Sequence, residues 1–199
     1  MDFGLLIVII VNASLVNNYV LNQFLGVCPF LGVLNQLRSS VGMGLAVTFV
    51  MVVSAFVTWP IQIYILDRNG LGFLQIIVFV LVIATLVQFI EIFLRKFVPA
   101  LYSTMGVFLP LMTTNCAIFG VTLSNMRSNF SYFESILNSL GAGLGFLLAM
   151  ILLTGIREQI ENADPPESFR GLPLTLISAT ILSLAFTGFG GIIENIFAK

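Results

Sequence analysis

Charged residues are scarce in this sequence, and histidine is absent. Only 9% of the 199 residues are charged, 58% are hydrophobic, and the mean hydropathy is +1.07. A soluble domain carries about 25% charged and about 45–50% apolar residues. Without histidine, the chain can form neither a histidine-ligated metal site nor a histidine general base. The composition therefore excludes a soluble globular fold and predicts a membrane protein.

Cysteine is also rare, and the net charge is close to zero. The chain holds two cysteines, too few for the disulfide scaffold of a secreted domain. Its formal net charge of −1 gives no reason to expect nucleic acid or an anionic surface as a partner. Asp2 stands where a signal peptide would carry positive charge, and no cleavage pattern follows the first apolar run. We therefore expect the first segment to remain in the mature protein.

Long apolar runs make up most of the chain. A bilayer core about 30 Å thick takes about 20 helical residues to cross. Six stretches reach this length, at positions 3–34, 41–66, 71–94, 98–123, 137–156 and 172–197. Polar residues interrupt the first and the fourth of them, and the polar connections include 125–135 and 157–171. The pattern predicts an all-α polytopic membrane protein with six transmembrane helices and no soluble domain.

The two halves of the sequence resemble each other. A Cys-x-x-x-Gly pattern begins at Cys28 and again at Cys116, 88 residues later. A Gly-x-Gly-Leu pattern occurs at 42–45 and at 141–144, which requires an insertion in the second copy. These matches predict an internal structural repeat, with each half contributing three of the six spans.

The expected halves are residues 1–98 and 99–199. Because three is an odd number, the halves must cross the membrane in opposite senses, which makes an inverted repeat with its axis in the membrane plane. Functional sites of such folds lie near the midplane, on interrupted helices. Cys28 and Cys116 lie on the first, interrupted span of each half. Lysine and arginine divide three against five between the two sides, which places both termini outside.

The residues around the two cysteines predict helix starts. Pro29 follows Cys28, and proline is favoured at the first helical position because it lacks the N–H that would have no partner there. Thr114 and Asn115 precede Cys116 and can cap the freed backbone groups. The positive end of a helix dipole favours a thiolate or an anionic cluster. We therefore expect two opposed half-helix ends, each carrying a sulfur.

Three interpretations of the cysteine pair remain open on these grounds. A disulfide at the midplane would have no obvious purpose, whereas free cysteine packs as a small hydrophobic residue. The third interpretation is a shared metal site. A [2Fe–2S] cluster takes four thiolates, so two more would come from a partner chain, for which we expect a paralogue of the same two-half design. Zinc with four thiolates is a further possibility.

Five segments around these motifs carry a resemblance to a known family. Segments 15–18, 25–32, 108–117, 155–158 and 169–171 resemble the A subunit of the bacterial Rnf electron-transport complex. The similarity covers nearly the whole chain. A sister family, the E subunit of the Na⁺-translocating NADH:quinone reductase, shares the run 115–120, but the Asn-Asn and Cys-Pro-Phe choices are more similar to Rnf.

This resemblance implies a component of a membrane complex that couples electron flow between ferredoxin and NAD to Na⁺ or H⁺ transport. It also implies a [2Fe–2S] cluster at the interface of the A and E subunits, with Cys28 and Cys116 as this chain's ligands. The Rnf E subunit, of opposite topology, and the B, C, D and G subunits would be partners in a bacterial or archaeal cytoplasmic membrane. The residues expected to support the cluster are Gly26, Pro29, Gly32, Thr114, Asn115 and Gly120.

The chain alone would hold no complete active site. The alternatives are the E subunit of the Na⁺-translocating NADH:quinone reductase, and, from another class, a secondary carrier whose broken spans bind a substrate or Na⁺, with incidental cysteines. An inert scaffold is a third interpretation. Iron content distinguishes the electron-transport subunit from the carrier and the scaffold.

Overall fold

The computed structural model describes residues 8–27, 37–97, 115–161, 166 and 171–197. Within these ranges all regular secondary structure is helical and there is no strand, in agreement with the all-α prediction. The elements are η1 (Asn12–Val16), α3 (Leu37–Ile61), η2 (Gln62–Asp67), η3 (Gly72–Leu74), α4 (Gln75–Phe97), α7 (Cys116–Arg127), α8 (Tyr132–Glu161) and α9 (Leu172–Phe197).

The described helices correspond to the predicted spans, except that α8 continues to Glu161, so residues 157–161 of the expected connection at 157–171 are helical. Three described helices are long and apolar enough to cross a membrane, namely Ser40–Asp67, Gly72–Phe93 and Tyr132–Ile160, and α9 contains the shorter apolar stretch Pro173–Gly188. These are the second, third, fifth and sixth predicted spans. The first predicted span is helical from residue 8 and breaks after Val16, as its polar residues indicated. Residues 98–114 of the fourth lie outside the described ranges.

The predicted boundaries of the polar connection at 125–135 are both wrong. Asn125 lies inside α7, and α8 begins at Tyr132, so only residues 128–131 connect the two helices. The backbone N–H of Ser131 donates to Glu134 Oε2 at 2.9 Å, one of the two bonds of a capping box. Because of this cap, α8 starts five residues before the expected position 137. The polarity of these residues had led us to predict a loop there.

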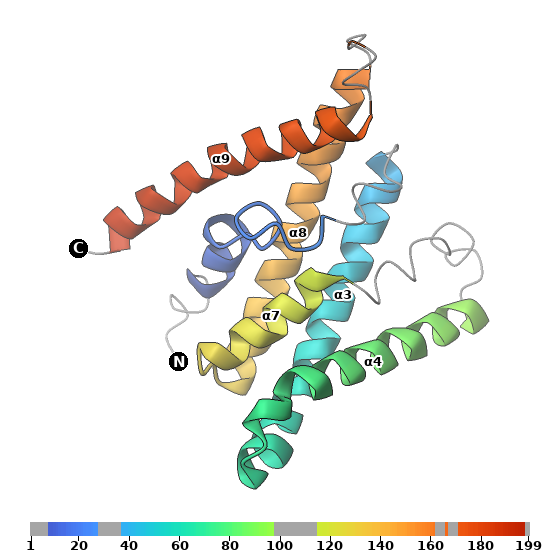
Figure 1. Cartoon of the computed structure of the whole chain (residues 1–199), viewed down its shortest axis with the longest axis vertical. Coiled ribbons are helices and arrows are strands. Elements are labelled where there is room, and N and C mark those ends of the chain that lie inside the picture. The colour runs from blue at the N-terminus through green and yellow to red at the C-terminus, as the bar shows by residue number, and fades with distance from the viewer. Residues whose placement is uncertain (1–7, 28–36, 98–114, 162–165, 167–170, 198–199) are drawn as a thin grey trace.

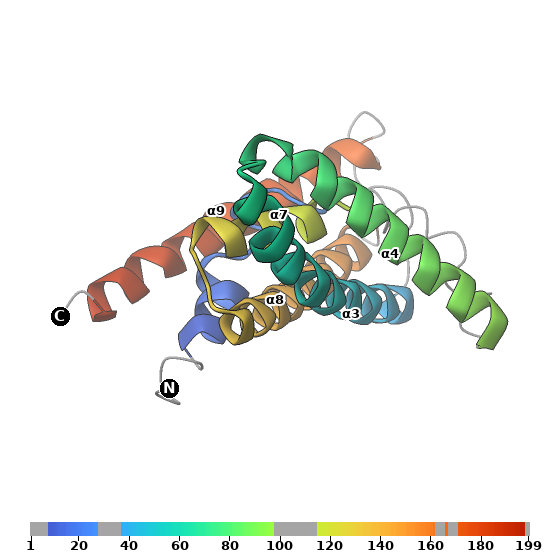
Figure 2. The ribbon, with the colours of Figure 1, turned by 90° about the horizontal axis from the view of Figure 1, so that it is seen from below.

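Two long helices form the centre of the molecule. Figure 1 shows α3 and α8 running together in opposite directions, with α9 crossing near one end of this pair and α4 near the other. Figure 2 shows α7 on the same side of the central pair as α4 and α9. This arrangement is compatible with the predicted inverted repeat.

Two glycines allow the central helices to approach closely. A Cβ atom added to Gly44 of α3 would lie 2.7 Å from Leu147 Cδ1, and one added to Gly143 of α8 would lie 2.5 Å from Thr48 Cγ2. Gly44 and Gly143 are equivalent in the two predicted halves, and so are Thr48 and Leu147. Reciprocal contacts of this kind are what a two-fold axis produces. The boundary between the halves at residue 98 stays a prediction.

The core includes a segment that is not helical. Most of its buried side chains come from α3, α7 and α8, and three come from the irregular segment after η1: Tyr19, Val20 and Leu21. By contrast, α4 and α9 expose large apolar side chains such as Ile77 and Leu184. In a bilayer such side chains face lipid or other subunits, whereas residues 18–21 of the irregular segment are buried inside the protein.

Candidate functional site

The site begins at the first turn of α7. Asn115 precedes the helix in an extended conformation, and its Oδ1 accepts a hydrogen bond from the backbone N–H of Ala117 at 3.0 Å. Its backbone oxygen accepts a bond from Ile118 N at 3.2 Å. Cys116 is therefore the first helical residue, where the positive end of the helix dipole lies. Its thiol is free and half-buried.

Residues 18–21 and 26 of the irregular segment 17–27 are buried in the bundle, where their backbone groups need protein partners. Asn18 supplies several of them. Its Oδ1 accepts from Val20 N and Leu21 N at 3.0 and 3.3 Å, while its Nδ2 donates to the oxygens of Ser14 and Gly145 at 3.1 and 2.9 Å. All hydrogen-bonding groups of the Asn18 side-chain amide thus have partners inside the protein. The bond to Gly145 ties the non-helical part of the first span to α8.

This segment packs directly on the first turn of α7. Gly26 has φ = +82°, and a Cβ added to it would lie 2.8 Å from Asn115 Oδ1 and 2.9 Å from Ala117 Cβ. One turn further along α7, a Cβ on Gly120 would lie 2.6 Å from Leu25 Cδ1. The glycine that closes the second Cys-x-x-x-Gly pattern therefore makes room for Leu25. Glycine at both positions brings the two chain segments together.

One polar atom at this junction has no partner among the described residues. Asn115 is 3% exposed, and its Nδ2 is buried without a hydrogen-bond acceptor. The other buried atoms in the same condition within the described ranges are Ser54 Oγ, Gln62 Oε1 and Ser135 Oγ. Asn115 Nδ2 is the one nitrogen of these four, and it belongs to the residue next to Cys116. An orphaned buried donor is uncommon and requires an explanation.

The structure brings together four of the predicted site residues. Cys116, Asn115, Gly26 and Gly120 meet where segment 17–27 crosses α7. The other four, Cys28, Pro29, Gly32 and Thr114, lie outside the described residues. The pairing of the two cysteines and their roles as ligands stay predictions.

Two residues at this junction were not predicted from the sequence. Phe146 of α8 lies beneath Gly26, since a Cβ there would lie 3.0 Å from its Cε2. Ser183 of α9 donates from its hydroxyl to the oxygen of Leu21 and so anchors the irregular segment to α9. A hydroxyl within an apolar span was the only signal in the sequence for Ser183, and nothing singled out Phe146.

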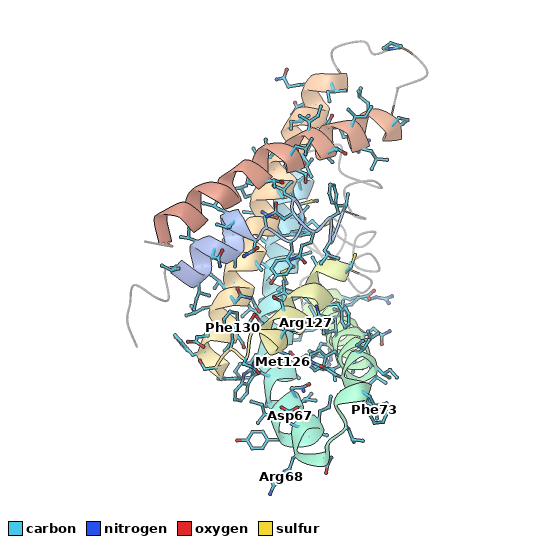
Figure 3. The ribbon with its side chains drawn as sticks, turned by 60° about the vertical axis from the view of Figure 1, so that its left-hand side comes forward. Asp67, Arg68, Phe73, Met126, Arg127 and Phe130 are labelled. Atoms are coloured by element: carbon cyan, nitrogen blue, oxygen red, sulfur yellow. The ribbon has the colours of Figure 1, made fainter. Side chains whose placement is uncertain are left out.

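The other end of α7 borders a different feature, a cavity of about 490 Å³. It lies between the end of α3, the start of α4 and the end of α7, and Figure 3 shows Asp67, Phe73 and Arg127 around it. Gln62 Nε2 donates to Asp67 Oδ1 at 2.7 Å, and Trp59 Nε1 donates to the oxygen of Phe130 at 3.0 Å. A helix of twelve residues is about 18 Å long. The cavity is therefore separate from the cysteine site.

The described residues do not form a complete metal site by themselves. No group of three or more cysteine, aspartate and glutamate side chains in these ranges could hold a metal ion. Any metal at Cys116 therefore needs ligands from outside the described residues. The predicted set, with Cys28 and two thiolates of another chain, has this property.

The sequence matches the family model described as "Rnf-Nqr subunit, membrane protein" over residues 6–193. It is 49% identical to the A subunit of the Na⁺-translocating ferredoxin:NAD⁺ oxidoreductase complex of Acetobacterium woodii, covering 94% of this chain and 97% of the relative. It is 48% identical to the A subunit of the ion-translocating oxidoreductase complex of Syntrophotalea carbinolica, covering 96% and 98%. The family match spans both cysteine segments. The chain therefore belongs to the Rnf-Nqr family of membrane proteins.

Proposed function

We propose that this chain is the A subunit of an ion-translocating oxidoreductase complex of the Rnf type. In this proposal Cys28 and Cys116 ligate a [2Fe–2S] cluster together with two thiolates of a paralogous membrane subunit. The observation that supports it best is the packing of Gly26 against Asn115 and Ala117, because these two residues flank Cys116 in the sequence. The names of the relatives support the assignment to an oxidoreductase complex.

Chain connectivity explains why this packing matters. Cys28 is the second residue after Gly26. Two residues of polypeptide span at most about 7 Å. A Cβ on Gly26 would be only 2.9 Å from Ala117 Cβ, and Ala117 is the neighbour of Cys116. The two sulfurs can therefore serve one centre without any rearrangement of the described helices.

The residues present are suited to such a centre. Cys116 is half-buried at a helix start, where an anionic thiolate centre is stabilised by the helix dipole. Asn115 Nδ2 is a buried donor without an acceptor in the described ranges, and a sulfur atom could serve as that acceptor. When bound, the cluster would supply a one-electron relay, whose potential depends on burial and on hydrogen bonds to sulfur.

A relay near the middle of the bilayer would divide an apolar barrier of about 30 Å into two shorter steps. By likeness to the relative from Acetobacterium woodii, we place ferredoxin and NAD⁺ at the ends of the electron path, with coupling to Na⁺ or H⁺ transport. The partner with the other two thiolates would be the Rnf E subunit, beside the B, C, D and G subunits. Cation uptake that is identical in oxidised and reduced proteoliposomes would refute the coupling.

The direct test measures iron and visible absorbance in the complex purified with this chain and its membrane partner. Cys28→Ser and Cys116→Ser should each remove one cluster's worth of iron and abolish electron transfer across the membrane. Ser124→Ala is the matched control, because Ser124 is half-buried on α7 two turns beyond Cys116. Full iron in both cysteine variants would refute the ligand assignment.

A secondary carrier is the second candidate, and the broken first span favours it. The chain leaves the helix after Val16 and crosses the core as irregular backbone, as discontinuous helices of carriers do. However, the Asn18 amide at this break is fully bonded to protein atoms and offers no ligand for an ion. A carrier would keep transporting after both cysteine substitutions, whereas the proposed relay would not.

A further inference from the structure

Capping alone does not explain why residue 115 is asparagine. Its Oδ1 caps α7 through the bond to Ala117 N, but serine, threonine or aspartate would provide an equivalent oxygen. Those residues would cap without leaving an amide NH₂ group behind. Asparagine instead places a donor on a side chain that is only 3% exposed, where it lacks an acceptor among the described residues. A buried donor left unpaired is unfavourable, so the amide must have a use beyond the cap.

The orientation of the amide follows from the cap itself. The backbone N–H of Ala117 can only donate, so the atom facing it must be the amide oxygen. The NH₂ group on the other branch then points away from the first turn of α7. Gly26 lies against the amide, since a Cβ there would be 2.8 Å from Oδ1. The donor is therefore located at the junction of α7 with the segment that leads to Cys28.

We propose that the Asn115 carboxamide donates a hydrogen bond to a sulfur of the centre that Cys28 and Cys116 ligate, and that this bond raises its reduction potential. The inference rests on the proposed function. The Cys116 thiol does not accept from Nδ2 in the structure, so the acceptor is another sulfur of the centre. An arriving electron makes that sulfur more negative, which strengthens the bond, while the proton stays on Nδ2. Hydrogen bonds to sulfur are an established means of setting such potentials.

The test uses two substitutions that keep the cap oxygen and remove the amide donor. Asn115→Ser is neutral, and Asn115→Asp retains the shape while replacing the NH₂ group by a charged oxygen. Both should retain full iron and lower the reduction potential, with the larger shift in Asn115→Asp. For a one-electron couple, each tenfold change in the equilibrium corresponds to about 59 mV. We expect about one such step for Asn115→Ser.

Asn125→Ser is the matched control. Asn125 is a buried asparagine on the same helix, and its amide is bonded to Ser135, Asn138 and Ser139. Its substitution should weaken folding but leave the reduction potential unchanged. An equal shift in the control and in Asn115→Ser would overturn the inference.

The measurement is a redox titration of the purified complex, followed by electron paramagnetic resonance, together with its iron content. Full iron with an unchanged potential in both Asn115 variants overturns this inference and leaves the proposed function standing. Absence of iron from the unmodified complex overturns the proposed function itself. If the variants do not assemble, the inference is tested instead by electron paramagnetic resonance of the unmodified complex with ¹⁵N in its asparagine side-chain amides. A hyperfine coupling between an amide nitrogen and the reduced centre supports the inference, and its absence refutes it.

Discussion

The two ends of α7 each carry a buried asparagine, and these two side chains differ in their hydrogen bonding. At the C-terminal end, Asn125 Nδ2 donates to Ser135 O and Ser139 Oγ at 3.2 and 3.0 Å, and its Oδ1 accepts from Asn138 Nδ2 at 2.7 Å. At the N-terminal end, only the oxygen of Asn115 has a partner among the described residues. The same residue type thus holds a closed network at one end and an open donor at the other.

This difference indicates what each end does. A fully satisfied buried network rigidifies the helix ends that it joins, in this case those of α7 and α8. An open donor contributes little to folding, so its value must come from something that binds there. The neighbouring glycines support the same conclusion, since Gly26 and Gly120 bring a second chain segment to the open end. We therefore assign stability to the Asn125 end and function to the Asn115 end.

The largest expected effect is at the closed network. Asn125→Leu leaves Asn138 Nδ2 without its acceptor in a buried site, which should lower the free energy of unfolding by about 2–4 kcal/mol. Asn115→Leu loses only a cap, worth about 1 kcal/mol. The midpoint of thermal unfolding in detergent measures both. If the two variants lose equal stability, the assignment of stability to one end is wrong.

A smaller effect is expected at the open end. Gly26→Ala strains a left-handed backbone and pushes against Asn115 and Ala117, which should cost about 2–3 kcal/mol and reduce the iron content. Gly70→Ala is the matched control, because Gly70 has φ = +65° with nothing within 4 Å of its added Cβ. It should cost about 1 kcal/mol from strain alone and leave the iron content unchanged. Equal losses of stability and of iron in the Gly26 and Gly70 variants would show that the contact between Gly26 and α7 is unimportant.

The smallest expected effect is at the crossing of α3 and α8, away from both ends of α7. Gly143→Ala would place a Cβ 2.9 Å from the Cα of Thr48, so we expect a loss of about 1–2 kcal/mol without a change in reduction potential. Gly155→Ala, also on α8, meets nothing within 4 Å and should be neutral or slightly stabilising. Unfolding midpoints and a redox titration of both variants check this. A change in potential in Gly143→Ala would mean that the crossing also controls the cysteine site.

Most of the helical fold could be predicted, because membrane-length apolar runs leave few alternatives to helices. The error at 125–135 has a specific cause. Asn125, Ser135 and Asn138 form a polar cluster in the sequence, which is typical of a connection. In the structure they satisfy one another inside two helices, so their polarity is buried instead of exposed.

The site could be predicted in part. Cys116, Asn115, Gly26 and Gly120 stood out through a repeated pattern, and they meet in space. Ser183 and Phe146 did not stand out, because their partners are far away in the sequence. Ser183 bonds to a residue 162 positions away. Contacts of this kind leave no local periodicity.

The amino-acid sequence by itself determined the membrane class, the helical character and the family of this protein, because each depends on composition or on local patterns. Tertiary structure decided which asparagine amide closes a network and which remains open. It also decided that Gly26 lies against Asn115, which is 89 positions away. The physical reason is that a hydrogen-bond donor is encoded locally, whereas its acceptor is supplied by whatever chain segment packs beside it.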